Sequence, residues 1–232
     1  MIFLSLYNEK IFRNLGVITK EEQKLLRKIP IAIVGLGGTG SVAFECLLRI
    51  GCENFVLFDR DRFELTNFNR QLLATDDYLD KKKTEAAIAR AKKINENVKI
   101  VAHGEFNPKK IRNAKIVIDG TDNVETRIEI ANACRKLRIP YVFCAASYAS
   151  GIISVFTDYK FEKAFQLPRA KSQKLKAYNT CISVIAPATM IAGSIAVSQA
   201  INYILKKPFI KAPDVLFFDL FAKGIFWKKR LG

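Results

Sequence analysis

The clearest chemical signal in the sequence is the glycine-rich stretch Val34-Gly35-Leu36-Gly37-Gly38-Thr39-Gly40-Ser41. It follows an apolar run, residues 29–34, and precedes a helix-like pattern that ends at Gly51. A strand, a glycine loop and a helix in this order form a phosphate cradle. Glycine lets the backbone come close to a phosphate, and the free N–H groups of a helix start attract its negative charge. We therefore predict a nucleotide site with contacts from Gly35, Gly37, Gly38, Thr39 and Gly40.

Asp59 supports the same interpretation. It ends a second apolar run, residues 54–58, about 20 residues after the glycine loop, where a carboxylate can accept hydrogen bonds from ribose hydroxyls. The alternative is that Asp59 caps a helix or forms a turn. Because a nicotinamide-dependent dehydrogenase would show the same loop and acid, these residues do not identify the nucleotide.

Two later segments add charged groups. Asp80 can cap a helix that runs to about Asn95, and the three lysines of residues 81–83 lie at its start. Cations at a helix start are unfavourable by roughly 0.3–1 kcal/mol each, so we expect an anion to dock beside them, unless Lys81 and Lys82 simply point into water. Residues 119–123, Asp-Gly-Thr-Asp-Asn, end another strand-like run, where open α/β sheets place their ligands.

The order of apolar runs predicts the fold class. Strand-like and helix-like segments alternate from residue 29 to residue 146, which is typical of an α/β, Rossmann-like, doubly wound and mostly parallel sheet. After that point strand-like runs at 151–157, 214–220 and 224–228 predict antiparallel C-terminal strands. We expect a single domain over residues 1–232, with an N-terminal arm and helix over 1–28 and a mobile crossover loop over 160–180.

Composition limits the function classes. The chain has 38 Lys and Arg against 22 Asp and Glu, a net charge of +16, which suits solubility, an acidic protein partner or RNA. Five cysteines without a Cys-x-x-Cys pair, and no signal peptide, favour a reducing, cytoplasmic location. His103 is the only histidine, which excludes a multi-histidine metal site.

The run from Ile182 to Leu205 has no charged residue and is long enough to cross a bilayer. Its Pro, Gly, Ser, Thr, Gln and Asn residues would make a poor lipid-facing helix. We therefore expect no membrane span here, and predict a helix buried within the domain or between two subunits.

Taken in order, these segments closely resemble the ThiF/MoeB/HesA family, the prokaryotic relatives of ubiquitin-activating enzymes. The resemblance runs from Tyr7 to about Leu220. A dehydrogenase has no need for the segments around Arg70 and Asp122, so the ordered set is more specific than the glycine loop alone. The residues that carry the resemblance are the glycine loop, Asp59, Asp61, Asn67-x-Asn69-Arg70-Gln71, Lys83 and Asp119-x-Thr121-Asp122-Asn123.

The resemblance implies adenylation of a carboxylate by ATP, usually at the C-terminal glycine of a small ubiquitin-fold carrier with a Gly-Gly tail. It also implies a homodimer. It assigns Asp59 to the ribose, Arg70 and Lys83 to the phosphates and Asp122 to Mg²⁺, with the last three as the catalytic residues. In the alternative interpretation, these are surface and turn residues. Further nucleotide contacts are implied for Asp61, Asn67, Asn69, Gln71, Thr121 and Asn123.

The chain departs from the family at several places. Many members have a Tyr-x-Arg segment near the N-terminus, whereas this chain reads Tyr7-Asn8-Glu9-Lys10, so either Lys10 or Arg13 substitutes or triphosphate chemistry is weakened. The paired Cys-x-x-Cys zinc ligands of many members are missing, so we predict no structural zinc. Cys181 is a candidate nucleophile for a thioester or an acyl disulfide, or else an inert apolar residue.

These observations support three hypotheses about function. The leading hypothesis is an ATP-dependent adenylyltransferase for a ubiquitin-fold sulfur carrier or modifier. The second keeps adenylation but acts on threonylcarbamoyl-adenosine in tRNA and dehydrates it, which the net charge of +16 would suit. The third is a catalytically degenerate homologue that serves as a binding partner.

Overall fold

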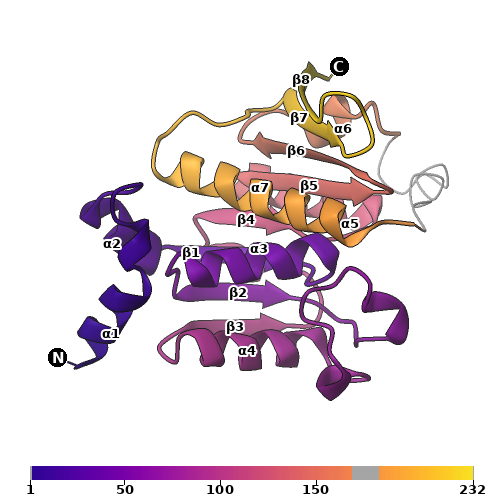
Figure 1. Ribbon diagram of the computed structural model, residues 1–232. Helices are drawn as coiled ribbons and strands as arrows, with labels where there is room; N and C mark the ends of the chain where they lie inside the picture. Colours follow the sequence, from indigo (N-terminus) through magenta and orange to yellow (C-terminus); the bar gives the residue numbers. More distant parts are fainter. Residues whose placement is uncertain (1, 169–182, 232) are drawn as a thin grey trace.

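The computed structural model describes residues 2–168 and 183–231, which form one eight-stranded sheet with helices on both faces (Figure 1). The strand order is β3-β2-β1-β4-β5-β6-β7-β8. The strands are β1 (Pro30–Val34), β2 (Asn54–Phe58), β3 (Lys99–His103), β4 (Ile116–Asp119), β5 (Tyr141–Ser147), β6 (Ser150–Phe156), β7 (Asp214–Asp219) and β8 (Phe226–Arg230).

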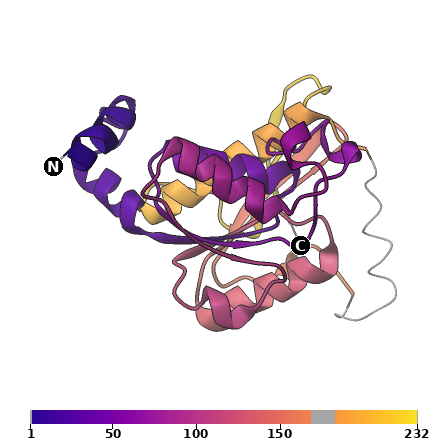
Figure 2. The same ribbon diagram turned by 90° about the horizontal axis from the view of Figure 1, so that it is seen from below.

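The helices divide between the two faces of the sheet (Figure 2). Among the described residues, α3, α4 and α7 pack into one hydrophobic cluster, and α5 and α6 pack into a second on the opposite face. The N-terminal helices α1 and α2 extend beyond the sheet (Figure 1). The α-helices are α1 (Ile2–Lys10), α2 (Lys20–Lys28), α3 (Gly38–Arg49), α4 (Lys83–Ile94), α5 (Val124–Leu137), α6 (Phe161–Ala164) and α7 (Ala186–Ile204). The 3₁₀ turns are η1 (Phe12–Asn14), η2 (Leu65–Asn67), η3 (Asp76–Tyr78) and η4 (Pro108–Ile111).

The strand directions confirm the predicted fold class. Strands β3, β2, β1, β4 and β5 are parallel, whereas β5, β6, β7 and β8 pair antiparallel. The change comes at β5, because β5 ends at Ser147 and β6 begins at Ser150, a connection too short for the crossover that parallel strands require. The chain winds from β1 outward to β2 and β3, then returns to β4 on the other side of β1. This reversal opens a crevice at the carboxyl ends of β1 and β4.

Two helix starts show how local residues set an element boundary. Thr19 and Glu22 form a capping box at the start of α2: Thr19 Oγ1 accepts from the Glu22 N–H at 3.1 Å, and Glu22 Oε2 accepts from the Thr19 N–H at 2.7 Å. The prediction that Asp80 caps α4 is wrong. The N-cap is Lys82, and Asp80 lies in a preceding turn at φ +61°, where its N–H donates to the carbonyl of Phe63.

The long apolar run becomes α7, which packs against α3. A Cβ at Gly193 would lie 2.5 Å from the carbonyl oxygen of Thr39, so the two helices meet through a position without a side chain. Ala192, Ala196 and Ala200 are fully buried beside it. Across the described ranges of the chain, none of the helices combines the length and the apolar character needed to traverse a lipid bilayer.

The loops after β1 and β4 touch through three glycines. The Gly120 N–H donates to the carbonyl of Val34 at 2.7 Å, and a Cβ at Gly120 would lie 2.4 Å from the carbonyl oxygen of Gly35. A Cβ at Gly40 would lie only 1.9 Å from the same oxygen, and Gly35 itself adopts φ +88°, which a side chain disfavours. These three positions therefore require glycine for close backbone contact.

We predict that Gly40→Ala lowers the free energy of unfolding by more than about 3 kcal/mol, because the neighbouring atoms are backbone and cannot move aside. Gly37→Ala is the matched control in the same loop, since a Cβ there would have no neighbour nearer than 3.8 Å. It should cost about 1 kcal/mol or less. Urea unfolding followed by circular dichroism measures both, and equal losses for the two variants would contradict this account.

Candidate active site

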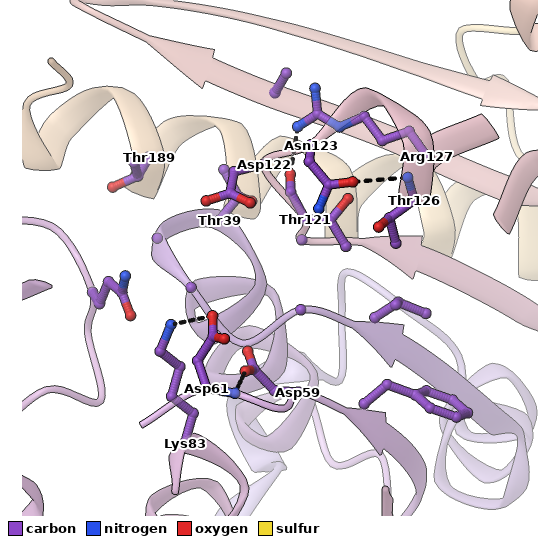
Figure 3. A pocket seen from close by; sticks show the side chains of 18 of the residues that line it. Thr39, Asp59, Asp61, Lys83, Thr121, Asp122, Asn123, Thr126, Arg127 and Thr189 are labelled. Carbon is purple, nitrogen blue, oxygen red and sulfur yellow. Dashed lines mark hydrogen bonds and ion pairs between the residues drawn. The ribbon is translucent and has the colours of Figure 1, made fainter. Parts of the chain in front are cut away.

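A cleft of about 590 Å³ lies at the carboxyl ends of the parallel strands, where the chain reversal was expected to place a ligand (Figure 3). Most of the residues predicted from the sequence line it. They are Gly35, Gly37, Gly38, Thr39, Asp59, Asp61, Arg70, Gln71, Lys83, Thr121, Asp122 and Asn123.

The glycine loop presents a helix start to the cleft. Gly37 is the N-cap residue of α3, so the N–H groups of the next residues lack acceptors within the helix. With no side chain at Gly37, the backbone here can lie against a bound group. Gly40 does not line the cleft, because its Cα faces the carbonyl of Gly35 beneath the loop. The loop therefore offers a site for an anion.

Asp59 closes the loop from the end of β2. Its Oδ2 accepts from the Leu36 N–H at 2.6 Å, and its Oδ1 accepts from the Asp61 N–H at 2.8 Å. Burial raises the pKa of Asp59 above its ordinary value, while the nearby charge of Lys83 opposes the shift. The carboxylate is thus held in place by the loop and keeps acceptor capacity toward the cleft.

Lys83 is the one cleft-lining residue of the three consecutive lysines. Its side chain is 7% exposed, and its Nζ lies 3.3 Å from Asp61 Oδ2. Figure 3 shows these two side chains pointing toward each other. Lys81 and Lys82 are exposed and do not line the cleft. The start of α4 thus directs a single ammonium group toward the site, in the low-exposure setting where its attraction to an anion is strongest.

Arg70 is held by its own turn. Its Nη1 donates to the Thr66 carbonyl at 2.6 Å and to Asn69 Oδ1 at 3.0 Å, and no other guanidinium hydrogen bond occurs within the described residues. Asn67 and Asn69 do not line the cleft. Asn67 accepts from the Glu64 N–H at 3.3 Å and stabilises η2, and Asn69 supports Arg70. Their observed contacts are therefore structural.

Gln71 places a buried amide group at the wall of the cleft. It is 6% exposed, and its Oε1 has no hydrogen-bond partner among the described residues. Buried polar atoms are normally satisfied, so an orphaned oxygen at the wall of a cleft indicates that a bound group or water completes the site.

The loop after β4 carries an exposed acid. Asp122 forms no hydrogen bond or ion pair with any other residue in the described ranges. The next residue, Asn123, accepts from the Thr126 N–H at 2.8 Å and caps α5 (Figure 3). Just before the loop, Asp119 is fully buried; burial raises its pKa, and the charge of Arg127 opposes that shift.

The side chains present suit magnesium bound together with a nucleotide. No group of three or more His, Cys, Asp or Glu in the described chain is arranged to hold a metal ion. Mg²⁺ commonly needs one or two carboxylates and takes its remaining ligands from phosphate oxygens and water. Asp122, free of protein partners in the described ranges and beside a phosphate cradle, fits that requirement.

Several lining residues were not predicted from the sequence. Thr189 comes from α7; its methyl carbon would lie 2.8 Å from a Cβ at Gly38, and its Oγ1 donates to the Arg70 carbonyl at 3.2 Å. Phe106 and Tyr148 also line the cleft from loops. No motif marks these residues, because their place depends on how distant segments pack.

Other sequence-based candidates lie elsewhere. Lys10 Nζ donates to the Ile94 carbonyl at 2.9 Å, and Arg13 is exposed; neither lines the cleft. Cys181 falls outside the described residues. Burial raises the pKa of Cys52 and of Cys144 to about 12, so these two thiols stay protonated near neutral pH.

Comparison with known proteins identifies a family. A sequence profile of the ThiF family matches residues 7–230. The chain is 34% identical over 219 residues to the molybdopterin-synthase adenylyltransferase of Haemophilus influenzae, a match that covers 89% of this chain and 88% of that protein. It is 29% identical over 186 residues to the sulfur carrier protein ThiS adenylyltransferase of Escherichia coli, covering 78% and 74% of the two chains.

A solved structure shares the fold. The crystal structure of E. coli MccB with ATP matches with a TM-score of 0.74 at 20% identity, and the match covers 91% of this chain and 66% of MccB. At that identity the likeness establishes the fold alone. The family profile spans nearly the whole chain, and on that ground the protein belongs to the ThiF family.

Proposed function

We propose that the protein is an ATP-dependent adenylyltransferase that activates the C-terminal carboxylate of a small ubiquitin-fold sulfur carrier or modifier. The observation that carries the proposal is the gathering of Arg70, Lys83 and Asp122 in one cleft with the glycine loop and Asp59. The named relatives, adenylyltransferases for molybdopterin synthase and for the sulfur carrier ThiS, support this substrate class.

The reaction sets a clear electrostatic requirement. A carboxylate oxygen of the carrier attacks the α-phosphorus of ATP; the new P–O bond forms as the bond to pyrophosphate breaks, and pyrophosphate leaves with the electron pair. Both reactants are anions, and negative charge builds on the leaving group. Catalysis therefore needs fixed positive groups around an in-line displacement rather than covalent help from the protein.

The residues of the cleft can meet that requirement. The Asp59 carboxylate accepts from ribose hydroxyls, and the N–H groups at the start of α3 meet phosphate oxygens. The Arg70 guanidinium and the Lys83 ammonium offset the charge on the triphosphate. Asp122 would hold Mg²⁺, which when bound would further neutralise the phosphates.

The proposal also covers the oligomeric state, the cellular location, the carrier's C-terminus and the domain organisation. We infer a homodimer in the cytoplasm, a carrier that ends in Gly-Gly, and a single adenylation domain over residues 1–232. Support comes from the family membership and from the exposed apolar side chains of the N-terminal segment, among them Phe12 at 65% and Val17 at 81% exposure.

A second candidate is dehydration of threonylcarbamoyl-adenosine in tRNA after the same adenylation step. The observation that favours it is a basic surface away from the cleft, where η4 packs against α5 through Ile111. Residues 108–115 and 132–138 contain no acidic residue, and salt-sensitive tRNA binding would fit them. Their exposed cations are Lys109, Lys110, Arg112, Lys115, Arg135, Lys136 and Arg138.

We predict carrier-dependent exchange of labelled pyrophosphate into ATP when the protein is incubated with a Gly-Gly-tailed carrier from the same genome. Exchange requires reversible formation of an acyl-adenylate, so a carrier that lacks its terminal glycine is the control. Absence of exchange with every such carrier, together with ATP-dependent loss of one water from modified tRNA, would replace the first candidate with the second.

We predict that Lys83→Met weakens ATP binding roughly 10- to 100-fold, the usual effect of losing one charge-assisted contact. Lys81→Met is the matched control, because it removes the same charge from an exposed neighbour that does not line the cleft. Its ATP affinity should stay within about twofold of wild type, since exposed charges are screened. Isothermal titration calorimetry measures both, and equal effects of the two substitutions would argue against a phosphate contact for Lys83.

A further inference from the structure

The acid proposed to hold Mg²⁺ sits on a loop that is tied down on both sides. Asp122 itself is exposed, with no partner in the described parts of the chain. Thr121 before it and Asn123 after it are both hydrogen-bonded. The structure thus fixes the backbone around a carboxylate that it leaves free.

The group that holds this loop in place is a second, buried acid, Asp119. Asp119 has no exposed surface, and its Oδ1 accepts from the N–H and the hydroxyl of Thr121 at 2.8 and 2.6 Å. Its Oδ2 accepts from the Tyr141 hydroxyl and lies 3.5 Å from Arg127 Nε. Both carboxylate oxygens have partners within the protein, and Asp119 neither is exposed nor lines the cleft, so its role is internal.

Arg127 also holds the loop, through a hydrogen bond to its backbone. Its Nη2 donates to the carbonyl of Thr121, which belongs to the peptide bond that joins Thr121 to Asp122. The guanidinium carbon lies 5.2 Å from the ring centroid of Phe143, and the side chain is 14% exposed. Arg127 lines the cleft, but its hydrogen bond and its charge contact point to the loop and to Asp119.

We propose that Asp119, Tyr141 and Arg127 form a positioning unit that orients the Thr121–Asp122 peptide so that the Asp122 carboxylate faces the phosphates and Mg²⁺. The inference rests on the proposed function. A buried carboxylate is tolerated only while its hydrogen bonds and its countercharge are in place, so this arrangement favours one conformation of the loop. Such support matters because a metal ligand must be held within a fraction of an ångström of its working place.

A similar tyrosine–arginine arrangement elsewhere supplies the control. The buried Tyr7 hydroxyl donates to the Gly51 carbonyl at 3.0 Å and accepts from Gln23 Nε2 at 2.9 Å. The Arg27 guanidinium lies 4.0 Å from the Tyr7 ring centroid. None of these residues lines the cleft, so Tyr7→Phe removes a buried hydroxyl without touching the loop.

The test is the Mg²⁺ dependence of ATP binding. Tyr141→Phe removes only the hydroxyl, and the ring keeps its neighbours Phe156 and Phe161 at centroid distances of 5.9 and 5.8 Å. ATP affinity is measured by calorimetry in EDTA and at increasing Mg²⁺. We expect affinity in EDTA to stay within about twofold of wild type, while the Mg²⁺ concentration for half of the affinity gain rises about tenfold.

The controls separate positioning from stability. Tyr7→Phe should lower Tm yet keep the wild-type Mg²⁺ response, and Asp122→Asn should lose that response. If Tyr141→Phe proves unstable, Thr121→Val removes one donor to Asp119, keeps the side-chain shape and should shift the Mg²⁺ response in the same direction.

A wild-type Mg²⁺ response in Tyr141→Phe and Thr121→Val, with the response lost in Asp122→Asn, would overturn the positioning unit and leave the proposed function standing. A wild-type protein that does not bind ATP, or an Asp122→Asn variant that responds to Mg²⁺ normally, would overturn the proposed function, and this inference with it.

Discussion

The close approach of two loop backbones, without a side chain between them, is the constraint on which the site depends. Gly35 and Gly40 after β1 and Gly120 after β4 lie so close that a Cβ at either of the last two would meet the Gly35 carbonyl. This contact brings the phosphate cradle and the Asp122 loop to one crevice. A wider separation would leave a helix start and an acid that could not act on the same triphosphate.

Helix α7 extends this constraint to the rest of the cleft. It meets α3 through Gly193, and Thr189 joins the glycine helix to the turn that carries Arg70. The helix is mostly apolar, and its apolar residues pack along one face of the sheet. The helix therefore supports both the glycine loop and the turn that carries Arg70. The stability of the core and the geometry of the cleft depend on the same contacts.

The cations near the cleft divide into two uses. Lys83 and Arg70 keep capacity for an anion, with partners that orient them and do not exhaust their donors. Arg127 instead stabilises a buried acid and a loop carbonyl. Net charge thus describes the site poorly, because the cations that line the cleft differ in their partners and in their exposure.

Local patterns in the sequence were enough to predict the alternating strand–helix part and to mark the segments around the glycines, Asp59, Lys83 and Asp122. These depend on local periodicity, on glycine and on the residue type at the end of each strand. The local pattern failed at α4, where it took a turn residue, Asp80, for the cap. The remaining residues of the cleft could be found only in the folded chain. Thr189 and Phe106 lie far from the glycine loop in the chain, and no local pattern records that their segments will pack beside it.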